Sequence, residues 1–217
     1  MISNQLPTDY QTFIATSRYA RWLEEENRRE TWTETVQRYI NYIATTGLPA
    51  KDLEEIEEAI LNLEVMPSMR ALMTAGPAAE RDNTCIYNCS YLPVDHIRAF
   101  DEAMFILLCG TGVGFSVERQ YISKLPEVPE INEEDTVIVV RDSKEGWAKA
   151  MRNLVTSLYL GVLPKWDVSK VRPAGAKLKT FGGRASGPAP LVDLFNFTVE
   201  VFKEAQGRRL TSLECHD

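Results

Sequence analysis

The chain has 217 residues, of which 44% are hydrophobic and 25% are charged, and its net charge is −7 at pH 7. These values are ordinary for a globular protein and exclude a disordered, collagen-like or low-complexity chain. A chain of this length buries a sufficient core without disulfides or a structural metal. No apolar run approaches the roughly 18 residues of a membrane helix, and the first residues lack the layout of a signal peptide. We therefore expect a cytoplasmic protein with no membrane partner.

The few cysteines and histidines exclude several kinds of site. The chain has four cysteines and two histidines, without a CxxC pair, a Cys/His cluster or an HExxH motif. We therefore expect neither a metal site nor a metal-dependent hydrolase. Cys109 lies on the apolar face of a predicted helix, which favours a core position. Cys89 starts a predicted strand and is either an inert buried thiol or one that meets a substrate. A disulfide between Cys85 and Cys89 is conceivable, but the spacing does not require it.

Positive charge is concentrated in one segment. Residues 141–184 contain ten basic and three acidic side chains, whereas residues 1–64 and 65–140 are both acidic. The net negative charge of the whole chain opposes general binding to nucleic-acid phosphates. The basic segment is therefore either a solvated helix face or a site for a small polyanion such as a nucleotide.

The first 65 residues have the pattern of a helical lobe. Apolar residues recur at helical spacing over residues 10–21, 30–45 and 52–63, and Gly47-Leu48-Pro49 separates the last two segments. We therefore expect a helical domain over residues 1–65.

From residue 66 the pattern changes to that of an α/β domain. The runs MPSMRALMTAG (66–76) and DNTCIYNCSYLPVD (82–95) are typical of strands and loops. Helical spacing covers residues 97–109 and 191–205, and buried strands are expected up to Val117 and over 136–140. Asp142-Ser143-Lys144-Glu145 resembles a capping box at the start of a helix that ends at Gly161. Alternating helices and strands predict an α/β fold over residues 66–217.

Two glycine-containing segments are candidate binding elements. Gly110-Thr111-Gly112-Val113-Gly114 is weak evidence alone, because such a run also serves a tight connection between a helix and a strand. The segment RPAGAKLKTFGGRASGP (172–188) combines four cations with four glycines. That composition suits a mobile loop that closes on a phosphate or a base.

Six segments, taken together and in order, resemble a known family. They are MPSMRALMTAG, YNCSYLPVD, the helix that leads into GTGVGFSVER, DSKEGW, RPAGAKLKTFGGRASGP and GRRLTSLECHD. Their combination closely resembles the N-terminal half of the catalytic subunit of ribonucleotide reductase, and it looks most like the adenosylcobalamin-dependent class. The likeness runs from about Arg18 to the last residue.

The resemblance implies a fold and a reaction. The helical lobe would be followed by the first half of a ten-stranded α/β barrel, which reduces the 2′-hydroxyl of a ribonucleotide by a thiyl-radical route for DNA synthesis. Cys89 would be one of two strand thiols that deliver reducing equivalents and become a disulfide. The family's other thiols and a carboxylate come from later strands, outside these 217 residues. Adenosylcobalamin, bound largely by the missing half, would be the cofactor, and a metal-carboxylate radical source is the alternative.

The resemblance also implies residues that bind two nucleotides. For the substrate, a ribonucleoside di- or triphosphate, they are Met66, Pro67, Ser68, Asn88, Gly110, Thr111 and Gly112. For a deoxynucleoside triphosphate effector they are Asp95, Arg172, Lys177, Lys179, Gly182, Gly183 and Arg184, within a region of about residues 141–188. The monomeric cobalamin enzymes carry a long insertion near this site, whereas about 50 residues separate GFSVER from RPAGAK here. We therefore expect a compact effector site and a homodimer formed through this region.

The expected partners follow from what the family has in addition. The chain ends at LTSLECHD, where the resemblance implies a continuation into the second half-barrel, and we expect no counterpart of the family's N-terminal ATP-binding cone. We expect one part of a split or processed reductase that is inactive alone and pairs with a second chain; an artificial fragment is the alternative origin. A thioredoxin-like or glutaredoxin-like reductant would be a further partner. The alternative function is a non-catalytic nucleotide-binding module that keeps the fold and the basic loop.

Overall fold

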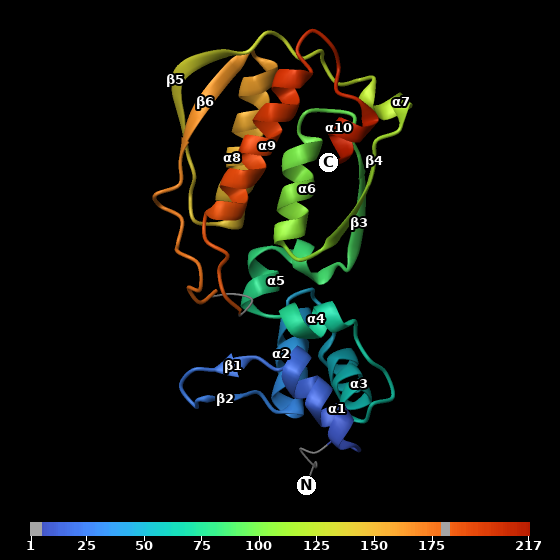
Figure 1. The fold of residues 1–217 in the computed structure, drawn as a ribbon. Coiled ribbons are helices and arrows are strands. Elements are labelled where there is room, and N and C mark those ends of the chain that lie inside the picture. Colours follow the sequence, from blue (N-terminus) through green and yellow to red (C-terminus); the bar gives the residue numbers. More distant parts are fainter. Residues whose placement is uncertain (1–5, 179–182) are drawn as a thin grey trace. The chain divides into compact units, whose positions relative to one another are not determined.

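A computed structural model describes residues 6–178 and 183–217 of the chain. The chain divides into two compact units, Met1–Asn88 and Cys89–Asp217, and each is described by itself. The division lies later than the expected boundary after residue 65, because helices α4 and α5 pack with elements of the first unit. Figure 1 shows the elements of both units.

The first unit is mostly helical. Its elements are α1 (Asp9–Ile14), the π-helix η1 (Ala15–Tyr19), the antiparallel strands β1 (Trp22–Leu23) and β2 (Arg28–Arg29), α2 (Trp32–Ala44), α3 (Ala50–Leu61), α4 (Met69–Thr74), α5 (Pro77–Arg81) and the 3-10 helix η2 (Asn83–Ile86). A capping box between Thr31 and Glu34 starts α2. Val36 and Ile40 of α2 are buried and pack in one cluster with Ile60 of α3. The apolar residues at helical spacing over 30–45 therefore predicted the face of α2 that is buried.

One part of this unit differs from the sequence prediction. The three helical segments predicted before residue 65 are confirmed. The run 66–76, predicted as strand and loop, instead contains helix α4. Ser68 starts this helix, because its hydroxyl accepts a hydrogen bond from the Ala71 N–H at 3.1 Å and satisfies a free donor of the first turn. A good N-cap residue therefore outweighs the strand-like composition of the run.

A buried ion pair connects the elements of the first unit. Glu30 accepts hydrogen bonds from Arg38 Nε at 2.8 Å and from the Arg21 N–H at 2.9 Å. Arg38 also donates to the carbonyl oxygens of Leu72 and Ala75, both at 2.9 Å. Burial raises the pKa of the Glu30 carboxyl, but hydrogen bonds from Arg38 and Arg21 outweigh it, and the pKa lies below its ordinary value. The pair therefore holds α4 against α2 in its charged form.

The second unit is an α/β structure with two separate pairs of parallel strands. Its elements are β3 (Cys89–Pro93), α6 (Ala99–Leu108), β4 (Gly112–Ser116), α7 (Arg119–Ile122), β5 (Asn132–Val139), α8 (Lys144–Tyr159), β6 (Val162–Asp167), α9 (Ala189–Glu204) and α10 (Ser212–His216). Strand β3 pairs with β4 and β5 pairs with β6. Helix α6 connects the first pair and α8 the second, as βαβ units require. The α/β class predicted for this part of the chain is confirmed.

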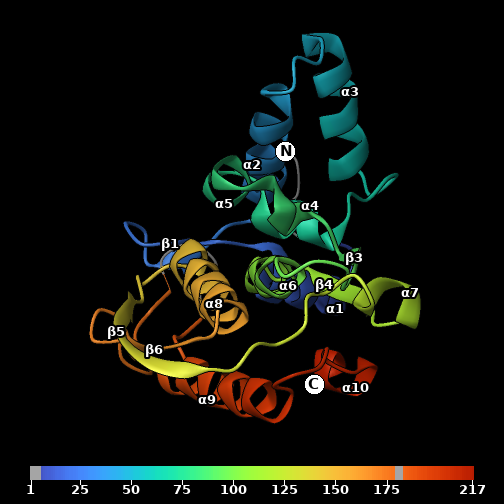
Figure 2. The same cartoon turned by 90° about the horizontal axis from the view of Figure 1, so that it is seen from above.

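Helix α8 is the centre of the core of this unit. It contacts α6, α9, β5 and β6 (Figure 2). Leu154 and Leu158 of α8 are fully buried and pack in one cluster with Val140, Leu191 and Phe195. The predicted apolar face of this helix is therefore the one that the unit buries.

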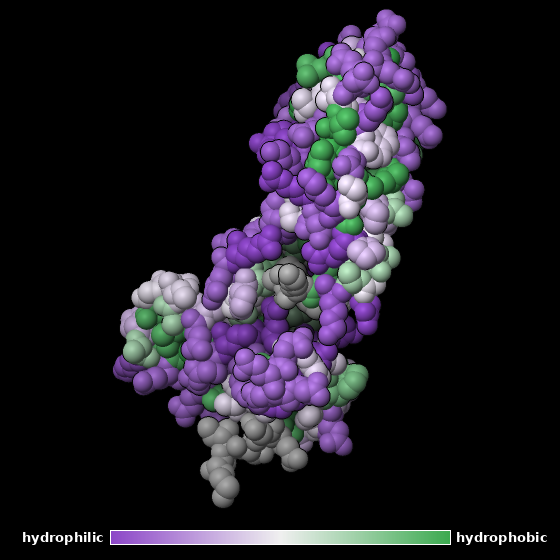
Figure 3. Space-filling model, turned by 90° about the vertical axis from the view of Figure 1, so that its left-hand side faces the viewer, coloured by the Kyte–Doolittle hydropathy of each residue, from purple (hydrophilic) through white to green (hydrophobic). Residues whose placement is uncertain are grey.

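Strands β4 and β5 are more exposed than the sequence predicted. Phe115 of β4 and Val137 and Val139 of β5 are exposed, and within β5 only Ile138 is buried. Each sheet has two strands and a single connecting helix, so one face of each pair lacks a covering element among the described residues. Figure 3 views the side on which β5 and β6 lie and shows apolar side chains among hydrophilic ones at the surface.

The start of α8 also differs in detail from the prediction. Ser143, not Asp142, is the N-cap, because its hydroxyl accepts a hydrogen bond from the Gly146 N–H at 3.0 Å. Glu145 is therefore the second helical residue and cannot close a capping box with Asp142. This one-residue shift frees Asp142 for a different partner. None of the helices in the described ranges is long and apolar enough to cross a membrane.

Candidate functional site

Cys89 stands at the open end of the β3–β4 pair. It is the first residue of β3, its side chain is exposed, and its thiol is free. Cys85, in the other unit, is buried and also free, so the conceivable disulfide between them is not formed. In the parallel register Cys89 lies opposite Gly112, the first residue of β4. The first residue of β3, which carries the thiol, is therefore paired with the end of the glycine turn.

The glycine turn exposes backbone next to this thiol. Helix α6 ends at Leu108 with Cys109 as its C-cap, and Gly110 then takes a positive φ of 79°, a conformation that favours glycine. Gly112 is exposed, whereas the side chain of Thr111 is buried. Ser90 Oγ donates to the Gly112 carbonyl oxygen at 3.2 Å, which fixes the two strand starts together. A small molecule beside Cys89 could therefore approach Gly110 and Gly112 closely, but not the Thr111 side chain.

Cys109 is a buried thiol with a polar neighbour. It is 1% exposed, so the predicted core position is confirmed. Lys144, the first residue of α8, donates a hydrogen bond to its sulfur at 3.1 Å, a contact that no local sequence pattern predicts. The same ammonium lies 5.0 Å from the centroid of the Phe105 ring. Cys215 is also buried, and burial raises the pKa of its thiol to about 11, so it stays protonated. Among the four cysteines, Cys89 alone is exposed.

Four of the residues expected at the substrate belong to the first unit. Met66 and Ser68 are exposed and Pro67 is half-buried, at the segment that enters α4. The Ser68 hydroxyl is engaged as the N-cap. Asn88, also exposed, is the last residue of the unit. Their roles toward a substrate therefore stay predictions.

Asp95 is paired with a lysine. Its carboxylate accepts a hydrogen bond from Lys124 Nζ at 3.1 Å, just beyond α7. Asp95 follows β3, and Lys124 follows β4 by way of α7. Both therefore lie beyond the ends of their strands, whereas Cys89 lies at the start of β3.

The basic loop is folded as a short antiparallel ladder. Backbone hydrogen bonds join Gly175 and Ala176 to Ala185, and Leu178 to Gly183, with a β-bridge between Lys177 and Arg184. Gly183 has a φ of 86°, and so turns the chain where a side chain would be strained. Lys179 and Gly182, both expected to contact an effector, lie outside the described residues.

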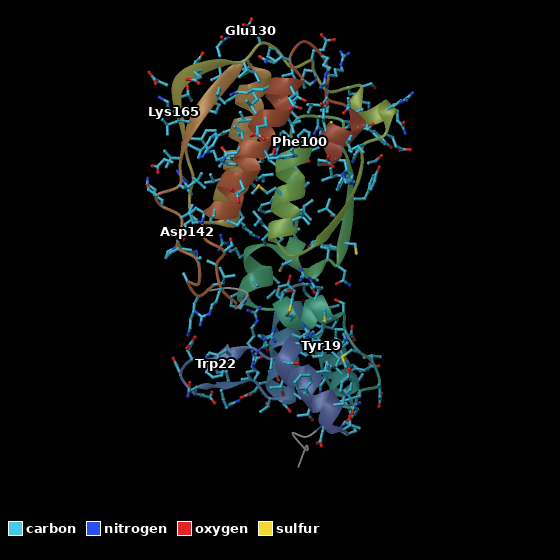
Figure 4. The ribbon with its side chains drawn as sticks, viewed as in Figure 1. Tyr19, Trp22, Phe100, Glu130, Asp142 and Lys165 are labelled. Carbon is cyan, nitrogen blue, oxygen red and sulfur yellow. The ribbon has the colours of Figure 1, made fainter. Side chains whose placement is uncertain are left out.

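The cations of this loop differ in their availability. Arg172 donates to the carboxylate of Asp142 at 2.8 Å, and Arg184 donates to the Gly175 carbonyl oxygen at 2.8 Å. Figure 4 labels Asp142 at the turn between β5 and α8. Lys177 is exposed. Since Arg172 and Arg184 are engaged in contacts within the protein, Lys177 is the most accessible of these three cations for a phosphate. Within the described ranges, no three His, Cys, Asp or Glu side chains converge to hold a metal ion.

An apolar hollow lies elsewhere in the second unit. Its volume is about 420 Å³, and Phe115 of β4, Leu107 and Leu108 of α6, and Phe197 of α9 line it. Glu214 and Asp217 are the acidic residues in its lining. It is a hydrophobic surface without charged residues on most of its walls, and so is unsuited to a nucleotide phosphate.

Known proteins that are similar to this chain come from the family that the six motifs resemble. Residues 123–202 match the family described as B12-dependent ribonucleotide reductase, insertion domain. This match includes α8, β6 and the basic loop.

Curated relatives match nearly the whole chain. The adenosylcobalamin-dependent ribonucleoside-triphosphate reductase of Lactobacillus helveticus is 29% identical over 273 residues, which cover 92% of this chain and 37% of that protein. A putative enzyme of the same name from Mycobacterium phage D29 is 28% identical over 84% of this chain and 31% of its own length. Because 92% of 217 residues is about 200, the Lactobacillus helveticus protein has about 70 more residues in the matched stretch.

The fold is also similar to that of a solved ribonucleotide reductase. A crystal structure of a B12-dependent, class II ribonucleotide reductase superposes with a TM-score of 0.82 at 25% identity, over 94% of this chain and 38% of that one. The chain is therefore similar to adenosylcobalamin-dependent, class II ribonucleotide reductases, and the resemblance predicted from its motifs is confirmed. It spans little more than a third of the length of these relatives.

Proposed function

We propose that this chain is the N-terminal part of a ribonucleotide reductase and contributes one of the two thiols that reduce the substrate. The observation that supports this most is the exposed, free thiol of Cys89 beside the open backbone of Gly112, in a chain similar to these reductases over more than nine-tenths of its length. The fold that completes it would be the ten-stranded α/β barrel, of which this chain would form the first half.

The proposed chemistry is a two-electron reduction of the ribose. The C2′–O bond of the ribonucleotide breaks, the oxygen leaves as water, and a hydrogen takes its place. The thiols of Cys89 and a second cysteine supply the two electrons and two hydrogens and are left as a disulfide. A thioredoxin-like or glutaredoxin-like dithiol then reduces this disulfide by thiol exchange, which an exposed sulfur permits. The route would be initiated by a thiyl radical on a third cysteine, outside these 217 residues.

We propose that the radical cofactor binds outside the described part of this chain. Adenosylcobalamin, when bound, would supply the radical that starts the reaction. The apolar hollow of about 420 Å³ has the volume of a drug-sized site, and adenosylcobalamin is far larger. The residues of this chain would instead bind the substrate at Gly110, Thr111, Gly112, Asn88 and Met66 to Ser68.

The basic loop is proposed to bind a deoxynucleoside triphosphate effector. Lys177 would contact a phosphate, while Arg172 and Arg184 hold the loop through Asp142 and Gly175. Asp95, whose partner is now Lys124, would contact the nucleoside only after that pair opens. A homodimer through this region would complete the site.

Reconstitution tests the proposed function. The 217-residue chain is mixed with a polypeptide that carries the remaining two-thirds of a class II reductase, adenosylcobalamin, a ribonucleoside triphosphate and a dithiol. We expect deoxyribonucleotide from the mixture and none from either part alone. Product from the purified chain alone, or no product from a mixture in which the two parts bind, contradicts the proposal.

A second candidate function is a nucleotide-binding module without catalysis. It is favoured by one observation, the ordered ladder of the basic loop with Lys177 exposed. In this case calorimetry would detect deoxynucleoside triphosphate binding that Lys177→Ala weakens about ten-fold, since a charged hydrogen bond contributes about 1.5 kcal/mol or more. Lys170→Ala, an exposed lysine before the loop, is the control. Binding without any product in the reconstituted mixture would favour this module over the reductase.

A further inference from the structure

Two polar contacts at the start of α8 join it to different elements, one to the basic loop and the other to the end of α6. Arg172, where the basic loop begins, donates to the Asp142 carboxylate at 2.8 Å. Lys144, two residues later, donates to the sulfur of Cys109 at 3.1 Å. Only Ser143, the N-cap of α8, separates the two residues. One short turn therefore contacts both the loop and the end of α6.

This turn is held rigidly. The Ser143 hydroxyl accepts from the Gly146 N–H at 3.0 Å, and the Ser143 N–H donates to the Arg141 carbonyl oxygen at 2.9 Å. Gly146 packs so closely on Arg141 that a β-carbon at this position would collide with the Arg141 carbonyl oxygen. A displacement of Asp142 is therefore passed to Lys144 and is not absorbed between them.

Lys144 is connected through Cys109 and the glycine turn to the strand that carries the exposed thiol. Cys109 is the C-cap of α6, and the chain continues through Gly110 and Thr111 to Gly112, which lies opposite Cys89. The same two helices are joined again where Arg152 of α8 contacts the buried carboxylate of Asp101 of α6 at 2.7 Å. That second contact holds α6 against α8, so movement at Lys144 acts on the end of α6 and the glycine turn.

We propose that Asp142 and Lys144 are positioning residues that couple the basic loop to the strand of Cys89. A change in the loop that moves Arg172 shifts the start of α8, and Lys144 transmits this shift to Cys109 and the glycine turn. The exposure of the Cys89 thiol changes as a result. The inference rests on the proposed function in one respect: it takes Cys89 as a thiol that reduces the substrate.

A double-mutant cycle on the intact 217-residue chain tests this coupling without any nucleotide. The rate at which iodoacetamide alkylates Cys89 is measured by mass spectrometry of its peptide for the unmodified chain, Arg172→Gln, Lys144→Met and the double variant. We expect Arg172→Gln to change the rate about three-fold or more. In the Lys144→Met background the same substitution should change it by less than about 1.5-fold, because the connection is already broken.

Three further variants make the result specific. Lys144→Arg keeps a cation that can reach Cys109 and should restore at least half of the effect of Arg172→Gln. Asp142→Asn should reproduce the effect of Arg172→Gln if Lys144→Met does not fold. Lys165→Gln, which removes an exposed ion pair with Asp135, should leave the rate unchanged.

The proposal is wrong if Arg172→Gln changes the Cys89 rate equally in both backgrounds, or not at all, in variants with unchanged circular dichroism. Since the assay contains no nucleotide and no second chain, such a result leaves the proposed reductase function untouched. Conversely, a coupled rate in a chain that never yields deoxyribonucleotide upholds the coupling and rejects the reductase.

Discussion

At the residue scale, Cys89 and Cys109 are two thiols of opposite surroundings in one βαβ unit. Cys89 is exposed at the start of a strand, whereas Cys109 is buried and accepts a hydrogen bond from Lys144. In the reconstituted reductase, Cys89→Ser should reduce steady-state turnover by about 100-fold or more, because a hydroxyl cannot form the disulfide that carries two electrons. Cys109→Ser keeps an acceptor for Lys144 and should retain at least half of the activity. Deoxyribonucleotide formation per enzyme over time is the measurement.

The control for this prediction is the fold of both variants. Circular dichroism and thermal unfolding should be unchanged in Cys89→Ser, since the side chain is exposed. If the Cys109→Ser chain folds but is inactive while the Cys89→Ser chain stays active, the redox role belongs to Cys109 and the prediction is wrong.

What could be predicted about the site differs from residue to residue. The placement of Cys89 at the start of a strand followed from a continuous stretch of sequence, whereas its position opposite Gly112 became visible only in the register of β3 with β4. The contacts of Arg172 with Asp142 and of Lys144 with Cys109 join residues 30 and 35 positions apart. No local pattern carries such information, because it depends on how α6, α8 and the loop pack in three dimensions.

At the element scale, the contact between α6 and α8 depends on a buried charge. Asp101 is 2% exposed, and Arg152 donates to one of its carboxylate oxygens from both Nε and Nη2, at 2.9 and 2.7 Å. Arg152→Ala removes both of these hydrogen bonds from the buried carboxylate and leaves Arg98, whose Nε lies 3.8 Å from the other carboxylate oxygen. We therefore expect a loss of about 3 kcal/mol in the free energy of unfolding, measured by urea denaturation.

An exposed ion pair provides the matched control. Lys165 and Asp135 join β6 and β5, with side chains 67% and 99% exposed. Lys165→Ala should change the free energy of unfolding by at most about 1 kcal/mol, since solvent screens this pair. Equal losses in the two variants would show that burial of Asp101 does not set its contribution.

Helix α10 gives the chain a predictable response to acid. Arg208 donates two hydrogen bonds to Glu214, which also caps the helix through the Thr211 N–H. The hydrogen bonds from Arg208 lower the pKa of Glu214 to about 2 from an ordinary value of 4.5. Since the folded-state pKa is the lower one, the stabilisation is complete above about pH 4.5 and is lost as the pH falls toward 2.

The measurement is the difference in Tm between pH 6 and pH 3. Glu214→Gln should reduce this difference by a few degrees, because the glutamine does not titrate. Glu200→Gln, at an exposed position of α9, should leave it unchanged. If the Glu214→Gln chain keeps the full difference, other carboxylates determine the acid response of this unit.

The elements themselves were predictable where one apolar stripe runs along a helix. Helices α2, α3, α6, α8 and α9 follow this pattern and lie where the spacing placed them. Strand β6 was not predicted, because Pro164 within it argues against a strand. The exposure of β4 and β5 could not be predicted either, since a run of apolar residues does not show whether the sheet has a second covered face.

At the scale of the whole molecule, the two units have separate cores. Val36, Ile40 and Ile60 belong to a cluster formed entirely within the first unit, and Leu154 and Phe195 to one within the second. The ion pairs Glu30–Arg38 and Asp101–Arg152 likewise each lie within one unit.

These separate cores predict that damage to one unit stays within it. Arg38→Met leaves the buried Glu30 carboxylate without its guanidinium, and should lower the hydrogen-exchange protection of Val36 and Ile40 about ten-fold or more. Protection of Leu154 and Leu158 should change by less than about two-fold. Arg152→Ala should give the reverse pattern, with the loss in α8 and not in α2. The measurement is the NMR exchange rate of these backbone amides. If either variant lowers protection equally in both units, the chain unfolds as a single cooperative body. The boundary between Asn88 and Cys89 then does not separate two units of stability.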